Sequence, residues 1–186
     1  MAIKDSGTRM EFRTGAVRDI QKGKGRCDLM PIDVLADIYL YQFRDEIIHF
    51  VLKGIHRFQE TGNVEFLYDA LDAFTGETPY SEMFLDVSIH FEEGADKYGE
   101  RNWEKGLPVA CYINSAVRHY LKFLRGDDDE RHDRAFVWNM LCACWTTEHR
   151  PELCEYGERR CPCCDEILPP GYKDCPNCRV HVSDYE

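Results

Sequence analysis

The chain has 186 residues, of which 44% are hydrophobic and 31% charged, and its formal net charge is −11. This composition is sufficient for a buried core and excludes a disordered acidic tail. The acidic balance also argues against a nucleic-acid-binding protein, because duplex binding requires a basic surface. No apolar run approaches the roughly 20 residues that span a bilayer, and the N-terminal sequence lacks the apolar region of a signal peptide. We therefore expect a soluble, cytoplasmic protein without a membrane partner.

A basic arm is predicted over residues 1–30. Residues 1–26 contain seven Lys or Arg and three acids, which leaves a charge of +4 there and −15 in the rest of the chain. The segment is rich in glycine and shows neither a helical nor a strand period. We expect an extended arm that ends at Pro31, and a flexible tail is the alternative.

Helical periodicity begins at Pro31 and predicts an all-α domain over residues 31–150. A first helix is expected to run without interruption to about Gln59, and Gly99 and Gly126 are expected to end two later helices. No strand pattern of comparable strength precedes residue 160. The predicted helices cover residues 31–59, 64–74, 81–98, 109–125 and 127–150.

The composition shifts to Cys, Pro and Gly after Pro151, which predicts a separate C-terminal module over residues 151–186. It contains two Cys-x-x-Cys pairs, a spacing typical of a four-cysteine zinc ribbon or treble clef whose metal supplies the folding energy. Cys154 or Cys163 as a ligand, and an iron–sulfur cluster, are the alternatives. The expected Zn²⁺ ligands are Cys161, Cys164, Cys175 and Cys178.

Two groups of acids predict a Mg²⁺ or Mn²⁺ site in the helical domain. Glu92 and Asp96 are four residues apart on one predicted helix, with Glu93 beside them, and Glu130 and Asp133 are three apart on another. Acidic pairs on facing helices could hold a cation that also binds substrate phosphates. A solvated acidic surface is the alternative. For residues 127–129, surface and helix N-terminal charge is the expected role.

Between these two groups of acids, the sequence contains side chains that could bind phosphates or a base. Arg118 and Lys122 are four residues apart on one helix and could bind phosphate oxygens. His119 is a base, a metal ligand or a buried core histidine. The loop at 97–106 combines an aromatic residue, which either stacks on a base or is buried, with polar and basic ones: Lys97, Arg101, Asn102, Trp103 and Lys105.

Several blocks of the sequence resemble a known family: GAVRDIQKGKGRCDLMP, HFEEGADKYGERNWEKG, SAVRHYLKFLRG and ERHDRAFVWNML. They resemble a phage and prophage family of dATP/dGTP diphosphohydrolase-like proteins, which is similar to the all-α pyrophosphohydrolases of the MazG and MazZ type. The resemblance covers about residues 11–150. It implies a MazG-like helical bundle that assembles as a dimer or tetramer.

The resemblance also implies roles for individual residues. It makes Glu92, Glu93, Asp96, Glu130 and Asp133 the Mg²⁺ ligands, and His119, His132 and Asn139 match recurrent positions of the family blocks. His132 joins the metal set, Asn139 the substrate site, and Glu92, Glu93, His119 and Asp133 the catalytic set. Two departures are visible: the gap between Glu93 and Glu130 exceeds the usual MazG spacing, and relatives are expected to carry a basic residue in place of Asp96.

The function expected on this basis is Mg²⁺-dependent conversion of a (deoxy)purine nucleoside triphosphate to monophosphate and pyrophosphate, in phage nucleotide metabolism in the host cytoplasm. The phosphates would be held by Lys97, Arg101, Arg118 and Lys122, with Arg18, Lys24 and Arg26 of the arm closing over them. One alternative is an HD-type phosphohydrolase built on His132-Asp133 with His119 and His90. Another is a non-catalytic nucleotide-binding or zinc adaptor protein, such as a phage counter-defence factor.

Overall fold

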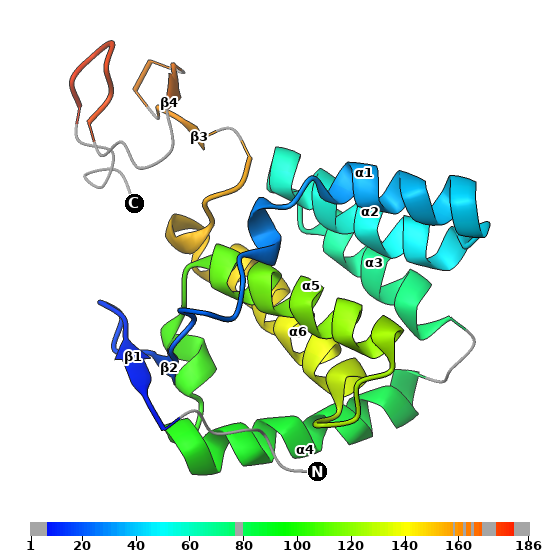
Figure 1. Cartoon of the computed structure of the whole chain (residues 1–186). Helices are drawn as coiled ribbons and strands as arrows, with labels where there is room; N and C mark the ends of the chain where they lie inside the picture. The colour runs from blue at the N-terminus through cyan, green and yellow to red at the C-terminus, as the bar shows by residue number, and fades with distance from the viewer. Residues whose placement is uncertain are drawn as a thin grey trace.

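The computed structural model describes residues 7–76, 80–157, 159–161, 163–164, 166–168 and 174–180. Its body is built from helices, which confirms the predicted all-α class (Figure 1). Within the described residues, none of the helices combines the length and apolarity required to cross a membrane. The helices are α1 (Ile32–Ile38), α2 (Glu46–Thr61), α3 (Glu65–Thr75), α4 (Tyr80–Tyr98), α5 (Val109–Arg125) and α6 (His132–His149).

The prediction of one uninterrupted helix over residues 31–59 is wrong. α1 passes into a short π-helical segment, Tyr39–Phe43, and the chain then turns back into α2. Arg44 adopts the left-handed conformation at φ 58°, and the Asp45 carboxylate accepts a hydrogen bond from the Ile48 amide at 3.0 Å. An N-capping aspartate of this kind satisfies one of the otherwise unpaired amides at a helix start. The turn lets α1 and α2 pack against each other.

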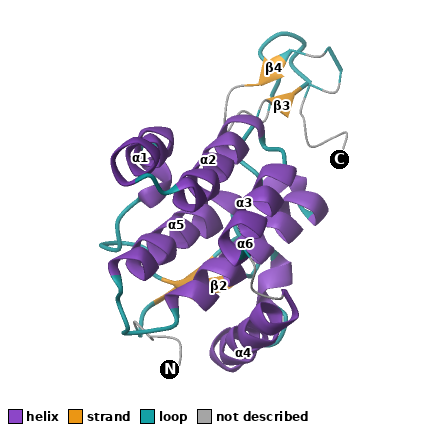
Figure 2. Ribbon diagram, turned by 90° about the vertical axis from the view of Figure 1, so that its right-hand side faces the viewer, coloured by secondary structure: helices purple, strands orange, loops and turns teal. Residues whose placement is uncertain are grey.

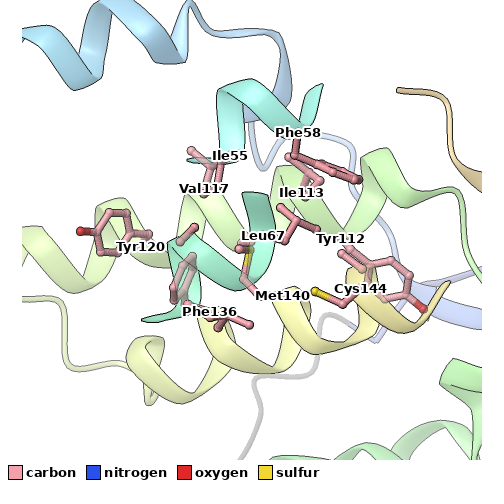
Figure 3. Close-up of a cluster of buried hydrophobic side chains, with 14 of the residues drawn as sticks. Ile55, Phe58, Leu67, Tyr112, Ile113, Val117, Tyr120, Phe136, Met140 and Cys144 are labelled. Atoms are coloured by element: carbon pink, nitrogen blue, oxygen red, sulfur yellow. The ribbon is translucent and has the colours of Figure 1, made fainter. Parts of the chain in front are cut away.

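The main core lies where α2 and α3 pack across α5 and α6 (Figure 3). Phe136 is fully buried, and its ring centroid lies 4.6 Å from that of Phe74 and 5.0 Å from that of Tyr120. Ile55 and Leu67 fill the space from the α2–α3 side, as Figure 3 shows. This core fixes α5 and α6 side by side, and these two helices carry Arg118, His119 and His132 of the site described below.

The start of α6 differs from the prediction. The sequence places the helix start in the acidic run at 127–133, whereas α6 begins at His132 with Arg131 as its N-cap residue. Glu130 therefore lies in the loop before the helix, and it does not share a helical face with Asp133. The loop begins after Gly126, which ends α5 in the left-handed conformation as predicted.

The N-terminal arm contains a small hairpin that the sequence pattern does not reveal. β1 (Arg9–Glu11) pairs antiparallel with β2 (Val17–Asp19). Asn102, in the turn after α4, accepts a hydrogen bond from the Val17 amide and donates one to its carbonyl, both at 2.9 Å. A side-chain amide thus continues the pairing of β2, and this contact holds the arm against the helical body. Lys97 and Tyr98 add to it through Asp19, at 2.9 and 2.8 Å.

α4 packs along α6 on the lower side of the body in this view, and its C-terminal end lies beside β2 of the arm (Figure 2). The chain leaves α6 through a short 3-10 turn at Pro151–Leu153 and passes close to the turn between α2 and α3. A Cβ at Gly157 would come within 2.4 Å of the Thr61 carbonyl oxygen, so glycine is needed for this close approach. The C-terminal segment then forms a second hairpin, in which β3 (Arg159–Arg160) pairs with β4 (Ile167–Leu168).

Candidate functional site

A cavity of about 770 Å³ lies between the arm, α4, α5 and the start of α6. This volume is in the range of sites that enclose a small organic ligand. Its wall combines apolar rings with side chains of both charges, and each of the four segments contributes. Most of the predicted substrate-binding side chains line it: Arg18, Lys24, Arg101, Asn102, Trp103, Arg118, Lys122 and Asn139.

Two guanidinium groups define the cationic part of the cavity. Arg18 reaches from β2 and donates to Ser115 Oγ at 2.6 Å and Asn139 Oδ1 at 2.9 Å. Arg118 donates to the same Ser115 oxygen at 2.9 Å, but its Nη1 is buried and has no hydrogen-bond partner. Burial, and then the charge of Arg18, lowers the pKa of Arg118. The two cations share a neutral hydroxyl, which leaves their charge available for an anionic ligand.

Lys24 extends this positive region toward the arm. Burial lowers the pKa of the Lys24 ammonium; the charge of Asp19 opposes this shift, whereas those of Arg118 and Arg18 add to it. Lys97 differs, because its Nζ lies 2.9 Å from the Asp19 carboxylate and both side chains are nearly buried. Lys97 thus fastens the arm to α4.

Aromatic side chains form another part of the wall. The ring centroid of Phe91 lies 5.7 Å from that of Trp103 and 5.8 Å from that of Trp138. His90 lies 5.5 Å from Trp138, ring to ring, and its buried Nδ1 has no hydrogen-bond partner. Such a wall can hold a flat apolar group such as a nucleobase beside the cations.

A cluster of imidazole and carboxylate groups lies at the end of α5 and the start of α6. His119 Nδ1 is 3.0 Å from His132 Nδ1 and 3.3 Å from Glu130 Oε1, and the latter oxygen is 3.4 Å from His132 Nδ1. His132 Nε2 lies 2.8 Å from Asp129 Oδ1. Burial lowers the pKa of His119 to about 2, and the charges of Arg118 and His132 act in the same direction. His119 is therefore a neutral imidazole at neutral pH.

The predicted Mg²⁺ ligands do not all meet at one point. Glu92 lines the cavity, whereas Glu93 forms an ion pair with Arg134 at 3.2 Å. Asp133 is bound by Arg131 at 2.8 Å, and Asp96 is exposed. Among the residues the structure describes, the groups of three or more potential ligands in the helical body are His119–Glu130–His132 and Asp127–Asp129–His132.

Several predicted phosphate-binding side chains have partners of their own. Arg26 forms a salt bridge with Asp28 at 2.5 Å, and Arg101 forms one with Glu104. Lys105 Nζ lies 3.4 Å from the Gly15 carbonyl oxygen. Neither Arg26 nor Lys105 belongs to the cavity wall.

Sequence reasoning missed the role of Asp129, which it assigned to surface charge. The carboxylate binds His132 on one side, and Lys122 Nζ lies 3.6 Å from its second oxygen. The spacing of three residues between Asp129 and His132 is a signal that could have revealed the contact. Ser115 was missed as well, because nothing in a buried serine on a helix indicates that two arginines bind it.

Burial of His90 makes the stability of the fold depend on pH. Burial first, and then the charges of Arg134 and Arg18, lowers the pKa of His90 to about 4. The unfolded chain therefore binds one more proton than the folded protein between pH 4 and about 6.5, so the free energy of unfolding should fall as the pH falls through this window. The expected loss is on the order of 1 to 3 kcal/mol.

Urea titrations at several pH values test this assignment. In His90→Gln, the slope of the free energy of unfolding against pH should be shallower by about one proton. His149→Gln, at an exposed histidine, should leave the slope unchanged. An equal slope in the wild type and His90→Gln would contradict the assignment.

The C-terminal cysteines form a compact cluster that could bind zinc. Cys161 Sγ lies 3.5 Å from Cys178 Sγ, and Cys164 Sγ lies 3.6 Å from Cys175 Sγ. Zn–S bonds of about 2.3 Å in a tetrahedron place sulfur atoms about 3.8 Å apart, so the cluster fits the ion closely. Cys163 is exposed and stands outside the group, and Cys154 Sγ lies 3.8 Å from the Tyr156 carbonyl oxygen.

Comparison with known proteins connects the cavity to a family. Residues 68–155 match the family described as dATP/dGTP diphosphohydrolase, N-terminal. The matched segment contains α4, α5, α6 and the loops between them. It supplies all of the cavity wall except the residues of the arm, and the whole imidazole–carboxylate cluster. No curated protein and no solved structure matches the chain. Residues 68–155 of this chain are therefore similar to the N-terminal domain of dATP/dGTP diphosphohydrolases.

Proposed function

We propose that the protein hydrolyses a purine (deoxy)nucleoside triphosphate to the monophosphate and pyrophosphate, with Mg²⁺ or Mn²⁺ bound to the nucleotide. The observation that supports this most directly is the buried Arg118 Nη1, which has no partner in a cavity with aromatic walls. A buried donor on a charged group is costly unless a ligand satisfies it. A phosphate is the ligand that two neighbouring arginines and Lys24 bind best. The family match at residues 68–155 points to the same substrate class.

The arrangement of the cavity suggests how the nucleotide lies in it. The triphosphate would bind Arg18, Arg118 and Lys24, and the base would lie against Trp103 and its aromatic neighbours. A divalent cation bound with the triphosphate would neutralise its charge and make the α-phosphorus a better electrophile. Glu92 lines the cavity and could accept the proton of the attacking water. Water attacks the α-phosphorus, the bond from that phosphorus to the α–β bridging oxygen breaks, and pyrophosphate leaves.

An HD-type phosphohydrolase is the second candidate, because His119 and His132 lie 3.0 Å apart beside the cavity. Asp133, the second residue of the HD pair, is instead bound by Arg131. This ion pair favours the pyrophosphate-releasing reaction, and the leaving group distinguishes the two candidates.

The test is a panel of purine and pyrimidine NTPs and dNTPs incubated with the purified protein and Mg²⁺ or Mn²⁺, with products identified by chromatography. We expect pyrophosphate and a purine nucleoside monophosphate, and a loss of turnover of at least about 100-fold in Glu92→Gln. The matched control is Glu104→Gln, which should retain activity. Glu104 is bound to Arg101 but does not itself line the cavity. Release of triphosphate would support the HD-type reaction, whereas tight binding of nucleotide without turnover would support the non-catalytic alternative.

A further inference from the structure

Three potential ligand atoms converge at the junction of α5 and α6. They are Nδ1 of His119, Nδ1 of His132 and Oε1 of Glu130, separated by 3.0, 3.3 and 3.4 Å. Ligands held at about 2.1 Å from one metal ion, with angles between about 90° and 110°, lie about 3.0 to 3.4 Å apart. The triangle already has the dimensions of one face of a metal's coordination shell.

The contacts of His132 orient its ring toward this point. His132 Nε2 lies 2.8 Å from the Asp129 carboxylate, and the Nδ1 side of the ring faces His119 and Glu130. The Glu130 oxygen is an acceptor. A carboxylate bound to the outer nitrogen of a ligating histidine is a recurrent second-layer contact in metal sites, where it fixes the tautomer and orients the ring. Asp129 has this position, and Lys122 lies 3.6 Å from its other oxygen.

The donor types select the class of metal. Two imidazole nitrogens and one carboxylate oxygen suit first-row transition ions such as Mn²⁺, Fe²⁺, Co²⁺ and Zn²⁺, whereas Mg²⁺ prefers oxygen ligands alone. His119 and Glu130 line the 770 Å³ cavity, so the remaining coordination positions would face it. Three protein ligands with open positions are typical of catalytic rather than structural metal sites.

We propose that His119, Glu130 and His132 bind one divalent transition-metal ion at the edge of the cavity, with Asp129 as the positioning carboxylate. This ion is separate from the zinc that the four C-terminal cysteines could bind, and its site does not require a nucleotide. The bound ion would stand close to Arg118, which directly precedes His119 in α5 and lines the same cavity. A phosphate oxygen could then contact both the ion and the guanidinium, which links the metal site to the proposed reaction.

The experiment measures metal binding without nucleotide. The metal-free full-length protein is first given one equivalent of Zn²⁺ to fill the cysteine site, because thiolates select zinc. It is then titrated with Mn²⁺, and free Mn²⁺ is followed by electron paramagnetic resonance. We expect one bound Mn²⁺ per chain, nitrogen hyperfine couplings from the two imidazoles, and no displacement by an equal concentration of Mg²⁺.

Isosteric variants identify the ligands. Glu130→Gln should weaken Mn²⁺ binding at least about 100-fold, and Asp129→Asn about 10-fold or more, as expected for a contact that orients a ligand. Asp128→Asn, at an exposed aspartate next in the chain, is the matched control and should bind Mn²⁺ like the wild type. Circular dichroism should show that all three variants remain folded.

Three results would overturn the inference: no Mn²⁺ binding, equal affinity in Glu130→Gln and Asp128→Asn, or a bound Mn²⁺ without nitrogen couplings. Because nucleotide is absent, these results are independent of the nucleotide panel. A protein that binds Mn²⁺ as expected but hydrolyses no triphosphate would retain the metal site and lose the proposed function.

Discussion

Replacing Arg118 by methionine should make the protein more stable and at the same time remove most of its affinity for a triphosphate. The side chain is partly buried, its buried Nη1 lacks a hydrogen-bond partner, and Arg18 donates to the same hydroxyl of Ser115. A buried charge without a counter-ion opposes folding, so an apolar side chain of similar length should raise the free energy of unfolding by about 1 kcal/mol. The same change removes a charge-assisted contact to phosphate, and we expect kcat/KM to fall about 100- to 1,000-fold.

The matched control for this prediction is Arg125→Gln, about two turns further along α5. Arg125 is exposed and forms a salt bridge with Asp127 at 2.5 Å, outside the cavity wall. It should change neither the stability nor the activity measurably, since exposed ion pairs contribute little. Thermal unfolding, nucleotide titration calorimetry and turnover should be measured on both variants. A destabilised Arg118→Met with normal nucleotide affinity would show that Arg118 serves the fold and not the ligand.

The largest effect at the C-terminal end should come from Cys175→Ser. Cys175 is buried in the cysteine cluster, and among the described residues of this segment Leu168 is the apolar side chain buried with the four sulfurs. So small a core cannot hold the segment together, whereas binding of zinc by four thiolates contributes on the order of 10 kcal/mol in comparable small modules. We expect the variant to lose its zinc, measured by mass spectrometry of the metal content, and to become sensitive to protease after residue 157.

The helical body should be unaffected by this change, because its core is made by α2, α3, α5 and α6. Its thermal unfolding, followed by the helical circular dichroism signal, should therefore match that of the wild type. Cys163→Ser is the control for the zinc content, since Cys163 is exposed and outside the cluster. If Cys175→Ser retained its zinc and Cys163→Ser lost it, the zinc ligand would be Cys163 and not Cys175.

The helix boundaries could be predicted from the sequence where local signals such as glycines mark them. They could not be predicted where contacts between distant residues determine the backbone conformation. Gly99 and Gly126 follow the last residues of α4 and α5 at positive φ, a region that favours glycine, and both helix ends were predicted. The break before α2 was not predicted, because the residue with positive φ at this turn is Arg44 and not a glycine. The hairpin of the arm also depends on a distant residue, since Asn102 binds both main-chain groups of Val17.

The same distinction applies to the site. Arg18, Arg118 and Lys24 were predicted to serve a phosphate, and the fold does bring them to one cavity. Pairing between charges could not be read from spacing, as Glu93 shows, because Arg134 lies 41 residues further along the chain. The imidazole–carboxylate cluster combines both kinds of information. Asp129 lies only three residues before His132, the first residue of α6, but His119 meets them only because α5 and α6 pack side by side.

The docking of the arm also bears on the order in which the protein is made and folds. Arg18 is joined to Cys111, Ser115 and Asn139 across 93, 97 and 121 residues of chain. During synthesis the arm leaves the ribosome before α5 and α6, so its partners do not yet exist when it emerges. Contacts at such separations form late, because the entropy of closing a long loop must be overcome first. A nascent chain would thus complete its helical body before it acquires a closed cavity, and a molecule whose arm has detached would remain folded with its cationic groups open to solvent.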